Sequence, residues 1–498
     1  MKILRYLLSI RAVGGITAQR VIQRSVQHFE SLDGPPFLPF ITLGFGTPAQ
    51  QISGILDTGS SDTIIPEAGS AVCKLKTQQC TAPARVIRGQ FDPKAACDFK
   101  RLDRQHFNAS FGGGDQYDGE FIETTVTLGD VGQGRIPNAQ VALATHSNPQ
   151  HEAPQVPVFG LGPQLLEATA TTYENLPKKM KSTRVTKSQA YSIVLNSTPF
   201  ANGSIFFGGI DRSKFDGELK EVPLERDIQG NIPQFVVKMS SLHLDLGARG
   251  KSNATDLQRA RERVRRIRWK RSIKTLDWNK MNALYSEKKE KNIIERKIMV
   301  GYGESKSSIA TNASTMTSIT RGNNGGNDCI TKKDEESSQK IDNNGGIAGS
   351  KIDLGLDSRD GFTLMDTGGV FIALPPPVLS SMANALSTTF SKDSFGPVEC
   401  NRLTGDSALI MRFNGDTVEA RVPLANMRIS DALVDPALTS RGLCLLGVTP
   451  TRAGDTNTAT LPFFAAVYTV FDMENNRLLF AQAKGDPSAP SCQLEEFP

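Results

Sequence analysis

Short apolar runs separated by glycine, proline and polar residues make up most of the chain. This texture extends from Phe37 to Thr63 and returns from Phe362 onward. Helical patterns are few and short, and one is expected at Pro377 to Leu386. Three further segments carry the β-branched and aromatic residues that favour strands: 121–128 (FIETTVTL), 191–195 (YSIVL) and 467–471 (VYTVF). The pattern therefore predicts a mainly β protein with few short helices.

The pattern changes between roughly Ala248 and Asp357. Residues 256–299 are rich in arginine, lysine and glutamate, with a few apolar residues spaced as in a helix. Residues 301–355 are rich in serine, threonine, asparagine and glycine. Segments of such low hydrophobicity cannot bury enough apolar surface to form a core. We therefore expect 248–357 to be a basic, low-complexity and disordered insertion.

Other interpretations of this insertion stay open at the level of sequence. Its basic part could contact an acidic partner or a membrane surface, although a solvated charged face is the simpler explanation. The pairs Arg265-Arg266 and Lys270-Arg271 could be processing sites in a secretory pathway. The segment could also be an unspliced intron in the gene model.

Length and charge narrow the class of protein. A chain of 498 residues is too long for one simple core, so two or more domains are expected. The net charge of +5 is local in origin, because residues 251–350 carry 21 basic and 12 acidic side chains, a net of +9, and the remainder carries −4. A slightly acidic body without a recognition motif gives no support for nucleic-acid binding.

Several features favour export. No apolar run approaches the roughly 18 residues of a membrane span, so no transmembrane segment is expected. Met1 to Ile10 resembles a weak secretory leader. We expect a glycoprotein that is secreted or enters the vacuolar-secretory pathway. Asn-x-Ser/Thr sequons occur at Asn108, Asn196, Asn202, Asn253 and Asn312.

The seven cysteines cannot all pair within one chain. They fit either a disulfide framework in an oxidising compartment or scattered reduced thiols, and the pairing among Cys73, Cys80 and Cys97 stays open. No Cys-x-x-Cys spacing occurs, and the five histidines form no ligand motif. We therefore expect neither a metal site nor a cofactor, and zinc hydrolysis has little support.

Two short segments resemble each other across a long separation: Ile55–Ser60 (ILDTGS) and Leu364–Gly369 (LMDTGG). In each, an apolar strand anchors a turn, glycine lets the backbone pass tightly, and an aspartate is left projecting at the tip. Two carboxyl groups held close cannot both ionise easily, so one keeps a proton while the other accepts one. The pair predicts acid and base chemistry at one water. The alternative is two aspartate turns that cap unrelated strands.

With these motifs the chain resembles the pepsin-like family of aspartic proteases, with a fungal look, over nearly all its length except the leader and insertion. The resemblance implies an all-β, bilobal fold with two β-barrel-like lobes around a central cleft. It places a leader and short pro-segment at 1–30, one lobe at 31–188, and the second lobe at 189–247 and 358–490. Further stretches that resemble the family are 43–50 (LGFGTPAQ), 159–162 (FGLG), 203–211 (GSIFFGGID), 215–219 (FDGEL), 466–472 (AVYTVFD) and 478–483.

The resemblance also assigns roles. Asp57 and Asp366 would be the catalytic pair, and Ser60 would support the outer oxygen of Asp57. Thr58 and Thr367 would lock the two loops together by hydroxyl-to-backbone bonds, while Gly59 and Gly368 would pack beside the water. Cys400 and Cys444 would form the disulfide of the second lobe. The family also implies a monomer that binds about eight residues of extended polypeptide and pepstatin-like inhibitors.

Three departures from the family pattern are visible. The flap position that normally carries tyrosine is Phe111, or Gly112 if no residue is inserted, and Tyr117 could substitute from a shifted flap. After the second aspartate, Gly369 replaces serine or threonine, which removes the counterpart of the Ser60 hydroxyl. Residues 460–462 (TLP) stand where a Leu-Gly-Asp run is usual.

These observations leave three functional hypotheses. The first is an aspartic-type endopeptidase with an acidic optimum. The second is a catalytically impaired relative that binds peptides or inhibitors without turnover, which the changes at Phe111 and Gly369 would favour. The third, with less support, is an interaction protein that acts through the basic segment 259–271.

Overall fold

The computed structural model describes residues 21–28, 38–75, 78, 80–81, 88–111, 116–129, 134–148, 157–169, 171–196, 201–247, 351–391, 394–431, 434–451 and 455–498, except the side chains of 103–105. Within these ranges strands predominate and the helices are few and short, which confirms the predicted mainly β class. Among the described helices, none combines the length and hydropathy that a bilayer crossing needs.

The largest sheet of the described chain has thirteen strands in the order β12-β26-β25-β9-β10-β1-β2-β3-β8-β4-β7-β6-β5. These are β1 (Ile22–His28), β2 (Pro39–Phe45), β3 (Gln50–Asp57), β4 (Thr63–Pro66), β5 (Lys100–Ser110), β6 (Gln116–Thr127), β7 (Arg135–Asn148), β8 (Val158–Gly160), β9 (Tyr191–Val194), β10 (Gly203–Phe207), β12 (Phe215–Pro223), β25 (Val467–Asp472) and β26 (Arg477–Ala483).

A second sheet has eight strands among the described residues, in the order β21-β20-β13-β15-β24-β16-β23 with β14 paired to β13. Its members are β13 (Val236–Asp245), β14 (Lys351–Asp353), β15 (Phe362–Met365), β16 (Ile372–Leu374), β20 (Ala408–Phe413), β21 (Val418–Pro423), β23 (Val448–Pro450) and β24 (Asn457–Ala459).

Short strand pairs and helices complete the architecture. The pairs are β11 (Gly209–Asp211) with β27 (Leu494–Glu496), β17 (Phe390–Ser391) with β18 (Ser394–Phe395), and β19 (Val398–Glu399) with β22 (Leu443–Cys444). The α-helices are α1 (Ala71–Lys74), α2 (Leu176–Ser182), α5 (Pro376–Ala385), α6 (Pro436–Thr439) and α7 (Leu461–Phe464). The helix expected at 377–386 is thus confirmed as α5.

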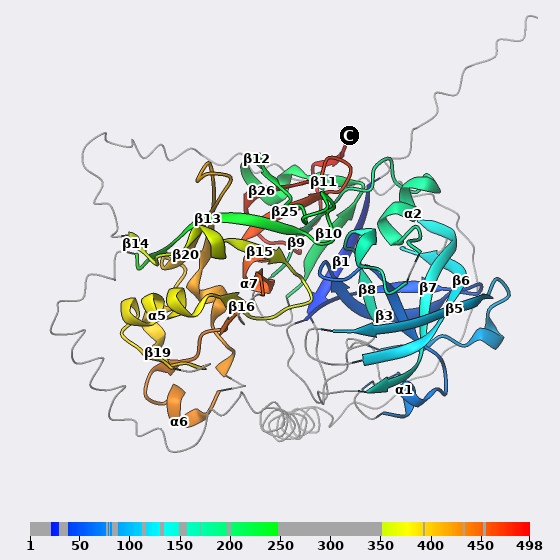
Figure 1. Cartoon of the computed structure of the whole chain (residues 1–498), viewed down its shortest axis with the longest axis horizontal. Helices are drawn as coiled ribbons and strands as arrows, with labels where there is room; N and C mark the ends of the chain where they lie inside the picture. The colour runs from blue at the N-terminus through cyan, green and yellow to red at the C-terminus, as the bar shows by residue number, and fades with distance from the viewer. Residues whose placement is uncertain are drawn as a thin grey trace, which may run out of the picture.

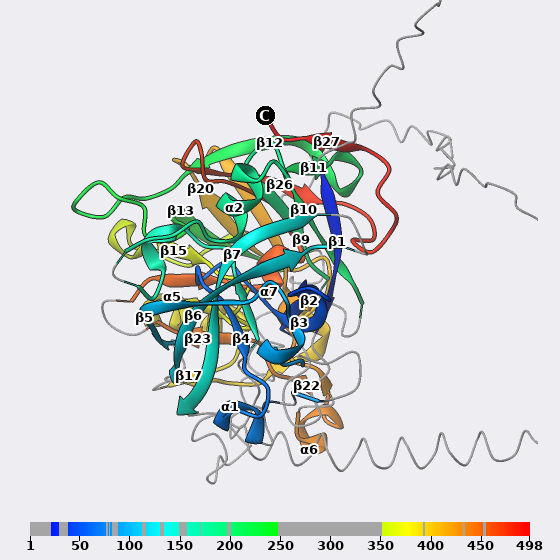
Figure 2. The same cartoon turned by 90° about the vertical axis from the view of Figure 1, so that its right-hand side faces the viewer.

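The thirteen-stranded sheet joins two lobes. Figure 1 shows β3, β5, β6, β7 and β8 on the right, β13, β15, β16 and β20 on the left, and β9, β10, β25 and β26 in the upper centre. Strand β1 connects the lobes, because it pairs with β10 through Ile22–Val26 and with β2 through Gln27 and His28. Figure 2 shows β1 running beside β10 toward β2.

Each lobe contains the same three-strand unit. In the first lobe, β3 pairs in parallel with β8, and β8 pairs antiparallel with β4. In the second lobe, β15 pairs in parallel with β24, and β24 pairs antiparallel with β16. The first strand of each unit leads into one of the two Asp-Thr-Gly turns. The sequence repeat therefore corresponds to a structural repeat.

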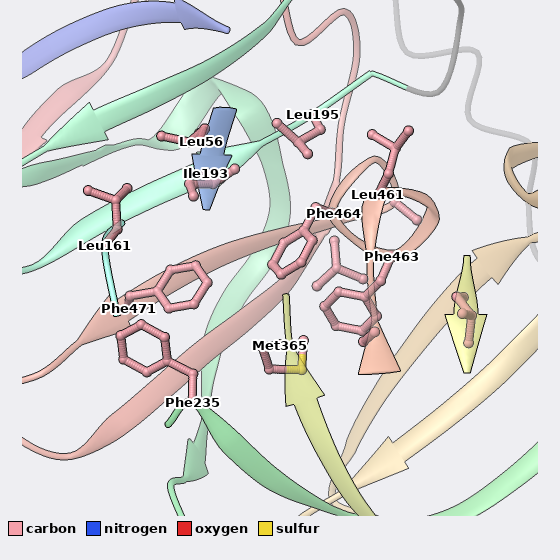
Figure 3. Close-up of a cluster of buried hydrophobic side chains, with 14 of the residues drawn as sticks. Leu56, Leu161, Ile193, Leu195, Phe235, Met365, Leu461, Phe463, Phe464 and Phe471 are labelled. Carbon is pink, nitrogen blue, oxygen red and sulfur yellow. The ribbon is translucent and has the colours of Figure 1, made fainter. Parts of the chain in front are cut away.

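A continuous apolar core lies behind these turns. Leu56 and Met365, which directly precede the two aspartates, are fully buried in it. Figure 3 shows both side chains in one cluster with Leu161, Phe464 and Phe471, which come from both lobes. Burying such side chains removes apolar surface from water, so the core fixes the strand ends that carry the site.

Two expected segments contain strands in the structure. Residues 22–28, which fall in the expected leader and short pro-segment, form β1, and Val26 is fully buried; residues 1–20 lie outside the described part. Residues 351–357, expected in the disordered insertion, begin with β14, and Leu354 is buried. The prediction of disorder was wrong for this end of the insertion. Ile352 and Leu354 make apolar contacts that the average composition of the insertion did not indicate. Residues 248–350 lie outside the described residues.

Candidate active site

The two aspartates lie in turns that the same local rule produces. Asp57 is the last residue of β3, and Asp366 directly follows β15. Asp57 is 8% exposed, and Asp366 is half-buried. In each lobe a strand that ends in a buried apolar residue, Leu56 or Met365, is followed by Thr-Gly after the aspartate, and so delivers a carboxyl group to the same place.

Thr58 and Thr367 join the turns by reciprocal hydrogen bonds. The Thr58 hydroxyl donates to the carbonyl oxygen of Met365 (2.7 Å) and accepts from the amide of Thr367 (3.0 Å). The Thr367 hydroxyl donates to the carbonyl oxygen of Leu56 (2.6 Å) and accepts from the amide of Thr58 (3.0 Å). All four partners are buried, where an unpaired polar group is costly. The bonds hold the turns in one fixed relation.

The two carboxyl groups face each other across two glycines. The amide of Gly59 donates to Asp57 Oδ1, and that of Gly368 donates to Asp366 Oδ1, both at 2.8 Å. A Cβ atom added to Gly59 would lie 2.8 Å from Asp366 Oδ1, and one on Gly368 would lie 2.6 Å from Asp57 Oδ1. Each glycine of one lobe thus contacts the carboxyl group of the other, and no larger residue fits.

The environments of the two carboxyl groups differ. The Ser60 hydroxyl donates to Asp57 Oδ2 at 2.5 Å, which favours the ionised form of Asp57. Burial nevertheless raises the pKa of Asp57. Burial, followed by the negative charge of Asp57, raises the pKa of Asp366 to about 8. The pair therefore places its proton on Asp366 and leaves Asp57 as the stronger acid.

The flap residues predicted from the sequence lie at a hairpin of β5 and β6. Phe111 follows β5 and is half-buried, with its ring 5.7 Å from that of Tyr117. Tyr117 is fully buried and its hydroxyl accepts from Gln78 Nε2 at 3.4 Å. Tyr117 therefore lies in the apolar cluster under the hairpin, and its role in the flap stays a prediction. Gly112 lies outside the described residues.

A buried network behind the first turn was missed in the sequence. Asp62 accepts from the Tyr173 hydroxyl (2.7 Å) and from the amide of Ala168 (2.8 Å), and Glu167 accepts from the amide of Tyr173 (2.7 Å). Burial raises the pKa of Asp62, and burial together with the charge of Asp62 raises the pKa of Glu167 to about 8. Asp62 stands 106 positions before Ala168 and 111 before Tyr173, so no local sequence pattern indicates that they make contact.

The structure shows how several of the cysteines are paired. It contains the disulfide Cys400–Cys444 that the resemblance implied, and a second disulfide, Cys73–Cys80. Cys97 is free and exposed. Among the described residues, no cluster of three or more metal-ligating side chains occurs.

Comparison with known proteins identifies the family. The model of the family described as "Eukaryotic aspartyl protease" matches residues 40–255 and 343–483. The chain therefore belongs to the eukaryotic aspartyl protease family. The stretch of this chain between the two matched parts lies inside the expected insertion.

Similar proteins come from fungi. A probable aspartic-type endopeptidase OPSB of Arthroderma benhamiae is 29% identical over 241 residues, covering 47% of this chain and 45% of that protein. Secreted aspartic protease 6 of Candida albicans is 34% identical over 182 residues, covering 36% and 41%. Candidapepsin-4 of Candida albicans is 33% identical over 187 residues, covering 38% and 42%. The chain spans less than half the length of these curated relatives.

Proposed function

We propose that this protein is an aspartic endopeptidase that hydrolyses peptide bonds with a water activated between Asp57 and Asp366. The observation that carries the proposal is that two carboxyl groups from different lobes face each other, one accepting a hydrogen bond from the Ser60 hydroxyl and the other with its pKa raised to about 8. Family membership and relatives named aspartic proteases support the same reaction class.

The proposed reaction uses the pair as base and acid. The ionised Asp57 accepts a proton from water while the water oxygen attacks the peptide carbonyl carbon, and Asp366 donates its proton to the carbonyl oxygen. The tetrahedral intermediate collapses when Asp57 returns its proton to the leaving nitrogen and Asp366 recovers a proton from the hydroxyl group. The C–N bond breaks, one water is consumed, and the carboxyl pair ends with one proton as it began.

The pKa directions set the pH range of this chemistry. The reactive form has one proton on the pair, so activity requires a pH above the pKa of Asp57 and below that of Asp366, which is about 8. We therefore expect a bell-shaped dependence of kcat/KM on pH with activity under acidic conditions. The substrate would be an unfolded polypeptide segment, and a pepstatin-like inhibitor would compete with it.

Replacement of either aspartate tests the proposal. Asp57→Asn and Asp366→Asn remove the base and the acid, so each should lower kcat/KM by at least about 10²-fold, the usual scale of general acid–base catalysis. The assay is cleavage of denatured protein between pH 3 and 6, with and without pepstatin. Asp431→Asn is the control, because Asp431 is exposed and pairs with Arg428. Full activity of both site variants would refute the proposal.

A second candidate function is peptide binding without turnover. It is favoured by the absence of a hydroxyl group at Phe111 and Gly369. Correctly folded wild-type protein that binds pepstatin or a peptide at acidic pH, yet shows no cleavage, would support this alternative over the first.

Secretion and a monomeric state belong to the same proposal. The relatives named secreted aspartic proteases and the sequons support export. Asn108 of one sequon is exposed on β5. Detection of a glycosidase-sensitive monomer in the medium would agree with this localisation, and a cytosolic unglycosylated product would not.

A further inference from the structure

We propose that the hydroxyl group of Thr460 supports Asp366 in the way that the Ser60 hydroxyl supports Asp57. Thr460 is then a positioning residue of the second aspartate. The inference rests on the proposed peptidase function and deepens it. It supplies the hydroxyl group whose absence at Gly369 favoured the alternative of a peptide-binding protein without turnover.

The first part of the argument concerns the two loops. Ser60 stands three residues after Asp57 and donates to its Oδ2 atom at 2.5 Å. Gly369 stands three residues after Asp366 and has no side chain to donate. The loop of the first lobe therefore places a hydroxyl group beside Asp57. The same position in the loop of the second lobe supplies no hydroxyl group to Asp366.

The second part concerns the neighbouring strands. In the first lobe the register of β3 and β8 pairs Asp57 with Gly160. In the second lobe the register of β15 and β24 pairs Met365 with Ala459, so the residue opposite Asp366 is Thr460. The hydroxyl-bearing residue and the glycine have therefore exchanged places between the two units. The second lobe carries its hydroxyl group on the neighbouring strand instead of the loop.

Space around Gly369 agrees with this exchange. A Cβ atom on Gly369 would lie 2.6 Å from Thr460 Cγ2 and 3.3 Å from Asp366 Oδ2. Thr460 Cγ2 and Asp366 Oδ2 are thus no further apart than the sum of these distances. The Thr460 side chain therefore fills the space that a serine at position 369 would need. This space lies next to Asp366 Oδ2.

The Thr460 hydroxyl makes no hydrogen bond in the described structure. Thr460 is 1% exposed, and its Oγ1 atom has no hydrogen-bond partner among the described residues. Thr460 precedes α7, where threonine often caps the helix, but it makes no side-chain cap bond. Pro462 has no N–H to offer, and the amide of Phe463 donates to the Thr460 carbonyl oxygen at 2.8 Å. A buried unpaired hydroxyl is unfavourable.

One rotation would turn this hydroxyl toward the side of Asp366. Turning χ1 of Thr460 by one staggered step places Oγ1 where Cγ2 now lies, on the side of Asp366 Oδ2. We assign the hydroxyl as donor to that oxygen. A hydroxyl that donates to a carboxylate stabilises its ionised form, so it counters part of the rise in pKa that burial and the charge of Asp57 impose on Asp366.

The test compares Thr460→Val, which keeps the shape and removes the hydroxyl, with Thr460→Ser, which keeps the hydroxyl. For Thr460→Val we expect the alkaline limb of kcat/KM against pH to move upward by about one pH unit, while Thr460→Ser keeps the wild-type limb. Thr388→Val is a matched control, because Thr388 is buried and its hydroxyl donates to Pro397 O at 2.7 Å. An unmoved limb in Thr460→Val, or equal shifts in the valine and serine variants, would overturn the inference.

A swap provides a second, independent test. Gly369→Ser alone should lower stability, because its Cβ would contact Thr460 Cγ2 at 2.6 Å. The φ angle of Gly369 is not in the left-handed region, so a serine is otherwise tolerated. Gly369→Ser combined with Thr460→Gly should return the alkaline limb to the wild-type position. A swapped protein that is folded but keeps the limb of Thr460→Val would contradict the exchange.

The role of Thr460 can also be tested in a way that does not depend on the proposed peptidase activity. If wild-type protein does not cleave, the peptidase proposal fails, and the role of Thr460 is then measured by urea unfolding at different pH values. Because the pKa of Asp366 is raised in the folded state, stability falls with rising pH until Asp366 ionises. Thr460→Val should extend this fall to higher pH. Superimposable curves for the two proteins would overturn the inference.

Discussion

At the scale of single residues, Gly368 sets how closely the carboxyl groups approach. A methyl group there would lie 2.6 Å from Asp57 Oδ1. Gly368→Ala should therefore push Asp57 out of place and lower kcat/KM by about 10²-fold, as expected for a displacement of about 1 Å. Kinetics on the purified variant measure this.

Gly405→Ala is the matched control for Gly368→Ala. A Cβ atom on Gly405 would meet no atom within 4 Å, and Gly405 is not among the glycines with positive φ. It should keep wild-type kinetics. Equal kinetics for both alanine variants and wild type would show that the carboxyl groups have room to spare, against the geometry described here.

The residues that the sequence could indicate are those in the repeat. Asp57 and Asp366 stand in matching local motifs, so a short-range pattern predicts that they lie together, although their catalytic role stays a proposal. Asp62 and Tyr173 make contact only through folding and show no such pattern. Thr460 was visible as a departure from the family sequence, but its relation to Asp366 depends on strand register.

At the scale of elements, the ends of β13 and β14 predict how the intervening segment can be replaced. Asp245 and Lys351 are register partners in this antiparallel pair, so the chain leaves and re-enters the sheet at neighbouring points. Replacing residues 248–350 with a short Gly/Ser linker should preserve the fold, because a short hairpin can join adjacent strands. We expect the free energy of unfolding to stay within about 1 kcal/mol of wild type.

Urea unfolding and the cleavage assay would check the shortened protein. Retention of activity would also count against a required role for the basic segment 259–271. Loss of the folded state, in contrast, would show that the replaced residues contribute packing that the β13–β14 pairing does not reveal.

Elements were predictable where local composition decides them. The segments expected at 121–128, 191–195 and 467–471 overlap β6, β9 and β25. The strand β14 was not expected, because three residues at the edge of a polar segment carry too little signal and owe their form to pairing with β13. The position of Tyr117 could not be predicted from its neighbours in the sequence, because it depends on how the long hairpin of β5 and β6 packs.

At the scale of the whole molecule, buried carboxyl groups tie stability to pH. The pKa values of Asp366 and Glu167 are each raised to about 8, against about 4 in an unfolded chain. Between these values the folded protein binds more protons than the unfolded one, so each group makes the free energy of unfolding fall as pH rises. The fall is at most about 1.4 kcal/mol per pH unit for each group.

Glu167→Gln isolates one of these contributions. Glutamine resembles the protonated acid and can still accept from the Tyr173 amide, so the variant should show a shallower fall than wild type between about pH 5 and 8. His28, whose pKa is lowered by burial, acts in the opposite direction in both proteins and cancels from the comparison. Urea unfolding over this pH range measures the two slopes, and Asp431→Asn should match wild type. Parallel slopes for Glu167→Gln and wild type would contradict a protonated Glu167.

The short strand at residues 22–28 limits how the protein can be trimmed. Its backbone hydrogen bonds are divided between β2 and β10, which belong to opposite lobes. Loss of this segment would leave two open sheet edges facing solvent, which invites association with other chains. If the chain is processed, an intact sheet therefore requires a cut ahead of Ile22, or retention of the severed strand as a bound peptide.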